Sequence, residues 1–149
     1  MNTDDAAWRS SRYLALAKTY EQAARAIADT QVAESLDLPF FALLGQAAEL
    51  ALKAVIARGG CDDERLLMLG HDLARCWDLA QAQIDLGDAP AKQIGGVIDL
   101  LAPPHQAQAF RYPTLLMWPL PPPGEALRAV SALLGMGADG APRAAAAVD

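Results

Sequence analysis

Two residues of opposite charge stand one helical turn apart in an apolar part of the chain. Glu49 and Lys53 lie in the segment ELALKA, four positions apart, with the acid on the N-terminal side. That order favours an ion pair along a helix. On a solvated surface such a pair contributes about 0.3–0.5 kcal/mol, whereas the apolar residues around it would hold both groups near the packed interior. Both interpretations are open from the sequence.

A histidine stands between a glycine and an aspartate in the segment GHDL. At the start of a helix, the free backbone amides and the imidazole of His71 could bind a phosphate together, or the imidazole could act as a general base. The alternative is a tether, in which His71 hydrogen-bonds a carbonyl or a carboxylate. Glu49 is the obvious partner, and the bond would fix the helix that follows His71 to the helix of Glu49.

A third segment that could do chemistry is FRYP, which contains Arg111 and Tyr112. The planar guanidinium of arginine suits a carboxylate or a phosphate, and the proline after Tyr112 favours extended backbone there. Arg111 either lines an anion site or anchors its loop by pairing with a carboxylate such as Asp72 or Glu49.

The residue types that most often bind zinc are few. Cys61, His71, Cys76 and His105 do not have the spacing of structural zinc ligands, so we expect no metal ligands and no cofactor. Two isolated cysteines also make no disulfide framework. His105 follows two prolines and precedes polar residues, and we expect it to be exposed.

The elements that would position these residues are helices. Of the 149 residues, 53% are hydrophobic, 20% are charged and only 6% are aromatic. Alanine and leucine dominate, which favours helix and excludes an all-β fold. The length suits one domain. We therefore predict an all-α fold, an antiparallel bundle of four to five helices with an ordered proline-rich loop before the last one.

Hydrophobic periodicity and helix-breaking residues predict five helices, over residues 5–29, 38–58, 71–86, 89–101 and 125–134. In the first helix, we expect a stripe that includes Trp8 and Leu16 to face the core. The second helix is apolar on most of its circumference and should lie at the centre of the bundle. Residues 61–70 should form a polar connection.

Proline sets the character of the last third of the chain. Eight of the ten prolines follow residue 102, and a stretch so rich in proline is not expected to form one helix. Its apolar side chains predict instead an ordered extended loop across the bundle. We expect residues 1–134 to form the domain and residues 135–149 to be a flexible tail.

Charge and targeting signals narrow the partners. The formal net charge is −6, which disfavours non-specific DNA binding. The N-terminus lacks the features of a signal peptide, and no apolar stretch approaches the ~18 residues of a membrane span. We expect a cytoplasmic protein, of bacterial type, without a membrane partner.

The three segments ELALKA, GHDL and FRYP, in this order, resemble the HEPN family (higher-eukaryote and prokaryote nucleotide-binding domain) over roughly residues 5–134. The resemblance implies an antiparallel bundle of four or five helices that forms a homodimer. It also implies work beside a nucleotidyltransferase, in toxin–antitoxin or defence systems, or as an RNA-cleaving or RNA-binding module.

The ribonuclease members of that family carry an arginine, four to six residues and a histidine in a late helix of the bundle. Arg65 and His71 match this spacing but lie in the polar connection and at the start of the expected third helix. His105 and Arg111 occur in reversed order on the proline-rich stretch. These four residues remain weak catalytic candidates, and none is assigned a catalytic role.

The favoured hypothesis is a non-catalytic, dimerising module that binds a nucleotide, RNA or a partner protein such as a nucleotidyltransferase or an antitoxin. The candidate binding residues are Glu49, Lys53, His71, Asp72, Arg111 and Tyr112. One alternative is a metal-independent endoribonuclease with an Arg/His pair at a dimer interface. The other is a purely structural subunit whose apolar residues 115–120 cover a partner.

Overall fold

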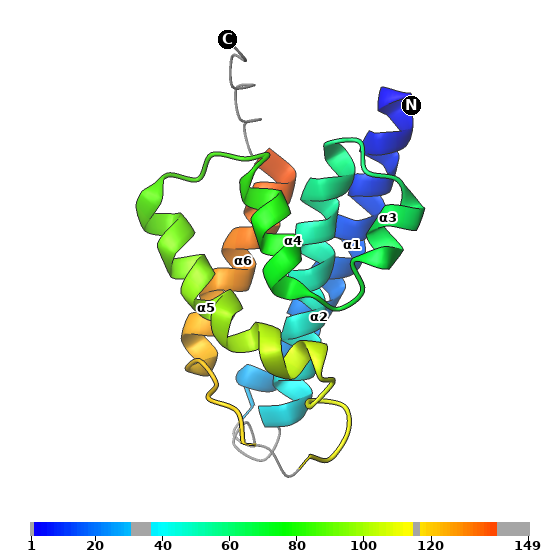
Figure 1. Cartoon of the computed structure of the whole chain (residues 1–149). Coiled ribbons are helices and arrows are strands. Elements are labelled where there is room, and N and C mark those ends of the chain that lie inside the picture. Colours follow the sequence, from blue (N-terminus) through cyan, green and yellow to red (C-terminus); the bar gives the residue numbers. More distant parts are fainter. Residues whose placement is uncertain (1, 31–36, 115–116, 140–149) are drawn as a thin grey trace.

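The computed structural model describes residues 2–30, 37–114 and 117–139, and this part of the chain contains helices and no β-strand. The elements are α1 (Thr3–Ala28), α2 (Asp37–Arg58), α3 (Asp63–Met68), α4 (Leu73–Gln81), α5 (Asp88–Gln106) and α6 (Pro123–Asp139). The helices pack side by side into one bundle in which α1 and α2 run antiparallel (Figure 1). The predicted all-α fold is confirmed.

Helix α2 forms the centre of the bundle, as predicted, and contacts all five other described helices. Most of its large apolar side chains are buried, and those of Leu44 and Leu52 are fully buried. By length and composition α2 is also long and apolar enough to cross a membrane, contrary to the expectation that no segment is. However, 83% of its most apolar window is buried inside the bundle, so this apolarity is accounted for by the core.

Helix α1 buries a different face from the predicted one. Trp8 is 62% exposed and Leu16 is 49% exposed, whereas Ala17 and Ala24 are fully buried. Small residues let α1 lie close against α2 along much of its length. This close packing stabilises the fold more than burial of the single large ring of Trp8 would. The polar end of Ser10 is satisfied at this interface by donating to the carbonyl of Ala54 at 2.8 Å.

The predicted polar connection over residues 61–70 contains a short helix, α3, whose N-cap is Asp62. Helix α4 is shorter than the predicted helix over residues 71–86. It begins at Leu73 because the side chain of Asp72 accepts a hydrogen bond from the amide of Arg75 at 2.9 Å, a typical N-cap. His71 therefore lies in the turn just before α4.

The proline-rich stretch differs from the prediction at its start, because Pro103 and Pro104 lie inside α5. Proline removes two amide donors there, and the last part of α5 changes direction, passes below α4 and crosses the lower part of α2 (Figure 1). Burial of Leu101 and Pro104 stabilises this bend in α5. The helix ends where Gln108 adopts a left-handed backbone conformation, with a φ of 54°.

Helix α6 extends to Asp139, beyond the predicted end at residue 134. Met136 is buried, and a β-carbon at Gly137 would lie 2.9 Å from the side chain of Leu14. These residues therefore pack on the bundle. The rest of the expected tail, residues 140–149, lies outside the described residues, as do Leu115 and Leu116 of the stretch proposed to cover a partner.

Candidate functional site

A buried carboxylate lies at the centre of the candidate site. Glu49 is 3% exposed. Its Oε1 accepts a hydrogen bond from Nζ of Lys53 at 2.8 Å. Its Oε2 lies 3.0 Å from Nδ1 of His71 and 2.7 Å from Nε2 of His105. We call these four residues the Glu49 cluster.

Three separate stretches of the chain build the Glu49 cluster. Helix α2 places Glu49 and Lys53 on one face, and Lys53 also donates to the carbonyl of Gly70 at 2.8 Å. This second bond fixes the turn before α4 to α2 and so positions His71. His105 comes from the last turn of α5, where the bend in that helix directs it towards α2.

The hydrogen bonds of the cluster determine the charge of Glu49. Burial alone would raise the pKa of Glu49. The bonds from His105, Lys53 and His71, together with the charge of Lys53, outweigh burial and lower the pKa from 4.5 to about 2. Glu49 is therefore ionised at neutral pH, and Lys53 beside it supplies the compensating charge that a buried carboxylate needs.

The two imidazoles share one oxygen of Glu49, which fixes their tautomers. When both rings are neutral, Nδ1 of His71 and Nε2 of His105 carry the protons and donate to Oε2. The other nitrogen of each ring then has a free lone pair. The His71 side chain is 39% exposed, whereas the His105 side chain is 8% exposed. His71 is thus the member of the cluster that reaches solvent.

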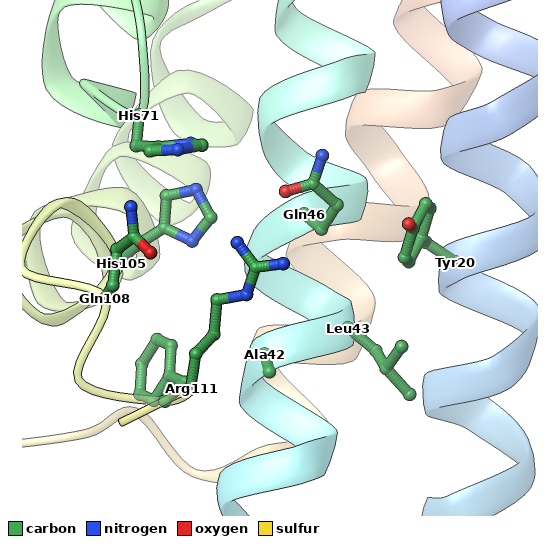
Figure 2. A pocket seen from close by; sticks show the side chains of 9 residues that line it. Tyr20, Ala42, Leu43, Gln46, His71, His105, Gln108 and Arg111 are labelled. Carbon is green, nitrogen blue, oxygen red and sulfur yellow. The ribbon is translucent and has the colours of Figure 1, made fainter. Parts of the chain in front are cut away.

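A pocket of about 250 Å³ opens beside the cluster, between α1, α2 and the end of α5. Figure 2 shows the side chains of Arg111 and Gln46 converging on the two imidazole rings. The lining residues are Tyr20, Ala42, Leu43, Gln46, His71, His105, Gln108, Phe110 and Arg111. None of them carries a carboxylate.

The loop that carries Arg111 is held in place by stacked aromatic rings. The ring of Phe110 stacks on that of Phe41 at 5.8 Å between centroids, with an interplanar angle of 25°. The backbone amide of Arg111 donates to the carbonyl of Gln108 at 3.0 Å. Arg111 is exposed, and its position at the pocket therefore comes from its backbone and from the neighbouring Phe110.

Three expectations from the sequence concern the contacts and the burial of the Glu49 cluster. The hydrogen bond between His71 and Glu49 is confirmed. The surface interpretation of the Glu49–Lys53 pair is wrong, because both side chains are less than 10% exposed, at 5% and 8%. The expected exposure of His105 is also wrong, because the proline pair before it continues the helix and its ring is buried against α2.

Arg111 lines the pocket beside the Glu49 cluster. Among the described residues its guanidinium forms no ion pair, so the anchoring alternative with Asp72 or Glu49 is wrong. Two other candidates lie outside the pocket: Asp72 caps α4, and Tyr112 is 67% exposed and does not line it. The backbone turn at Gln108 directs Arg111 to the pocket and leaves the next side chain outside.

Lys53 and Arg65 also differ from their expected positions. Lys53 does not line the pocket, because Glu49 and the carbonyl of Gly70 hold its ammonium group in the interior. Arg65 lies in α3, outside the pocket lining. The structure therefore brings His71, His105 and Arg111 to one pocket and leaves Arg65 apart from them.

Some residues of the site were not identified from the sequence. Gln46 stands three positions before Glu49 and lies one turn away on the same side of α2, a spacing that could have indicated it. Tyr20 and Gln108 had no comparable signal. His105 was misplaced because the prolines beside it were interpreted as ending the helix.

The expectation of no metal ligands rested on the spacing of cysteine and histidine along the chain. The structure instead combines two histidines with a glutamate. One ligand atom from each of Glu49, His71 and His105 lies within 4.8 Å of the others. Sequence spacing does not detect such a group, because its members come from distant positions.

Comparisons of the chain with protein-family models, with curated proteins and with solved structures gave no match. In the part of the chain that the structure describes, the fold and the site define a helical bundle with a buried, charge-compensated glutamate. This glutamate holds two imidazoles at the edge of a pocket whose described lining residues carry no carboxylate.

Proposed function

We propose that the protein is a helical binding module whose pocket takes the phosphate group of a nucleotide or of an RNA end. The observation that carries this proposal is the composition of the pocket. Arg111, His71 and His105 line it, and none of its described lining residues carries a carboxylate, although the chain as a whole has a net charge of −6. Nitrogen donors concentrated at one cavity of an acidic protein favour an anionic ligand.

The neighbouring charges support the same ligand. A guanidinium binds phosphate oxygens through paired donors, and protonated imidazole adds further donors. The negative charge of Glu49 lies behind the imidazoles and is compensated by Lys53 at 2.8 Å, so it repels an incoming phosphate little. Gln46 and Gln108 offer amides to a sugar or a base.

The size of the cavity limits how much of the ligand is enclosed. A volume of about 250 Å³ is smaller than the roughly 300–1,000 Å³ of pockets that enclose a drug-sized molecule. A phosphate and its attached pentose would fill it, and a base would extend towards solvent. This favours recognition of a terminal phosphate over recognition of a particular base.

The resemblance to the HEPN family agrees with this proposal, and with it we propose a cytoplasmic homodimer that works beside a nucleotidyltransferase or an antitoxin. The exposed apolar side chains of Trp8 and Leu16 on α1 offer a surface for a second copy or a partner protein. Light scattering after size exclusion would report a dimeric mass if the homodimer forms.

The binding proposal is tested by calorimetry on the full chain freed of metal with a chelator. Inorganic phosphate, AMP and adenosine are titrated separately. We expect phosphate and AMP to bind and adenosine to bind at least tenfold more weakly.

Arg111→Ala should weaken AMP binding at least tenfold, because it removes the paired donors. The matched control is Arg75→Ala, an exposed arginine outside the pocket, which should leave affinity unchanged. Equal affinity of Arg111→Ala and the unaltered chain would exclude this pocket.

A second candidate function is metal-independent cleavage of RNA. The observation that favours it is the orientation of His71, whose Nδ1 faces Glu49 at 3.0 Å. That leaves Nε2 available as a general base beside Arg111, which could stabilise the charge of a phosphorane. Arg65 has no part in this arrangement.

Incubation of RNA with the protein and a chelator tests this second candidate function. Cleavage should occur, and it should be lost in both His71→Ala and Arg111→Ala. Intact RNA after incubation with the unaltered protein would remove this candidate.

A further inference from the structure

We infer that Glu49, His71 and His105 form a binding site for one divalent transition-metal ion, with zinc as the simplest occupant. Three potential ligand atoms converge on one point: Oε2 of Glu49, Nδ1 of His71 and Nε2 of His105. They come from the middle of α2, the turn before α4 and the last turn of α5. Two imidazoles and one carboxylate are a ligand set that zinc uses in sites with an open position.

The distances suit an ion after a small adjustment. Zinc binds nitrogen and oxygen ligands at about 2.0–2.2 Å, and tetrahedral geometry then places neighbouring ligand atoms about 3.3–3.6 Å apart. Oε2 of Glu49 lies 3.0 Å from His71 and 2.7 Å from His105. The two rings meet edge to face, with 5.7 Å between centroids and an angle of 88°. Moving the side chains outward by a few tenths of an ångström would make room for the ion.

The protons balance without an additional reactant. Each neutral imidazole carries its proton on the nitrogen that faces Oε2. When the ion binds, that nitrogen donates its lone pair to the metal, and the ring proton moves to the other nitrogen through exchange with water. Two N–H···O bonds are thus replaced by three coordination bonds, and the net charge changes by that of the ion alone.

Lys53 orients the carboxylate without occupying the ligand position. Its Nζ binds Oε1, whereas the metal would bind Oε2. The ammonium group already compensates the charge of Glu49, so a bound divalent ion leaves two positive charges at the site. An anion or hydroxide at the open position would offset them. Imidazole ligands favour zinc and its transition-metal neighbours over Mg²⁺ and Ca²⁺, which prefer oxygen.

The pocket supplies the route for the ion. His71 and His105 line it, and the half-exposed His71 side chain forms the outer side of the cluster. An ion held by the three side chains would therefore have its open coordination position on the pocket side. This inference does not rest on the proposed phosphate binding, because the ion can be titrated without phosphate and phosphate without the ion.

The experiment is a titration of the chelator-stripped full chain with Zn²⁺ by calorimetry and with Co²⁺ by visible absorption. We expect one ion per chain and a Co²⁺ spectrum typical of nitrogen and oxygen ligands. His71→Ala should weaken binding at least tenfold. The matched control is Gln46→Ala, which lines the same pocket but contributes no ligand, and it should bind as the unaltered chain does. An excess of Mg²⁺ should not displace Zn²⁺.

Further variants guard against misfolding and against other ligands. His71→Gln keeps a donor for Glu49, so it should retain the circular dichroism of the unaltered chain while binding Zn²⁺ at least tenfold more weakly. Zn²⁺ should raise the Tm of the unaltered chain and leave that of His71→Gln unchanged. Absence of stoichiometric binding would overturn the inference. So would full binding by His71→Gln, or binding that is lost in Cys61→Ser and retained in His71→Gln.

Discussion

The imidazole of His105 occupies the space that a side chain at residue 45 would need. A β-carbon built on Gly45 would lie 2.6 Å from Nδ1 of His105, closer than any two such atoms can pack. The absence of a side chain on this turn of α2 therefore allows His105 to approach Glu49, one turn further along the same helix.

The first prediction concerns this contact. Gly45→Ala should displace His105 and destabilise the fold by about 1–3 kcal/mol, as overpacking does, and urea unfolding would measure the loss. Gly96→Ala is the control, because no atom lies within 4 Å of its β-carbon position in α5. That variant should be neutral or stabilising by up to about 1 kcal/mol, since alanine favours helix. Equal effects of the two substitutions would contradict the packing of His105 on Gly45.

The second prediction concerns the pH dependence of stability. The pKa of Glu49 is lowered from 4.5 to about 2 in the folded chain, so the unfolded chain binds the proton more readily. The resulting stabilisation is complete above pH 4.5 and is lost as the pH falls through about 2. Glu49→Gln lacks this contribution. The difference in unfolding free energy between the two chains should therefore be largest near neutral pH and should shrink towards pH 2, which urea titrations at several pH values would show. A constant difference would exclude an ionised Glu49.

The third prediction concerns the buried ion pair. Removing one partner leaves an uncompensated buried charge, which costs roughly 3–5 kcal/mol. Glu49→Gln and Lys53→Met should each lower the free energy of unfolding by about this amount at neutral pH. The double variant should lose less than the two losses added together, by at least about 1 kcal/mol, because it leaves neither charge unpaired. Additive losses in the double-mutant cycle would mean that the two groups stabilise the fold independently.

The fourth prediction connects the two proposals. If the ion and the phosphate occupy adjacent positions, each should strengthen binding of the other by the same factor. We expect Zn²⁺ to increase phosphate affinity about 5–150-fold, the usual range of coupling between sites. Calorimetry with Zn²⁺ and phosphate added in both orders measures this coupling. Unchanged affinities in the two titrations would place the two ligands at independent sites.

Much of the fold could be predicted from the sequence because helix formation depends on local features. The apolar circumference of α2 indicated its central position, and helix-breaking residues indicated its end at residue 58. Two features were predicted wrongly for physical reasons. The inward face of α1 is made of small residues that carry little hydrophobic signal. Pro103 and Pro104 remain in a helix because tertiary burial offsets their missing donors.

The candidate site could be predicted only in part. The Glu49–Lys53 pair is local, and its helical spacing is visible in the sequence. The bond between His71 and Glu49 was one of the two interpretations that the sequence left open for His71. His105 lies 56 positions from Glu49, and nothing local indicates that the two meet. Their contact depends on the bend in α5 and on the missing side chain of Gly45, and both are properties of the packed bundle.

The burial of Lys53 has a consequence for the chemical reactivity of the chain. Of the three lysines, Lys18 and Lys92 are exposed, whereas the Lys53 side chain is 8% exposed and its amine is engaged by Glu49 and Gly70. An acylating reagent should label the first two rapidly under native conditions and reach Lys53 only when the bundle opens. The rate at which Lys53 becomes acylated, followed by mass spectrometry, would therefore report how often the native protein opens.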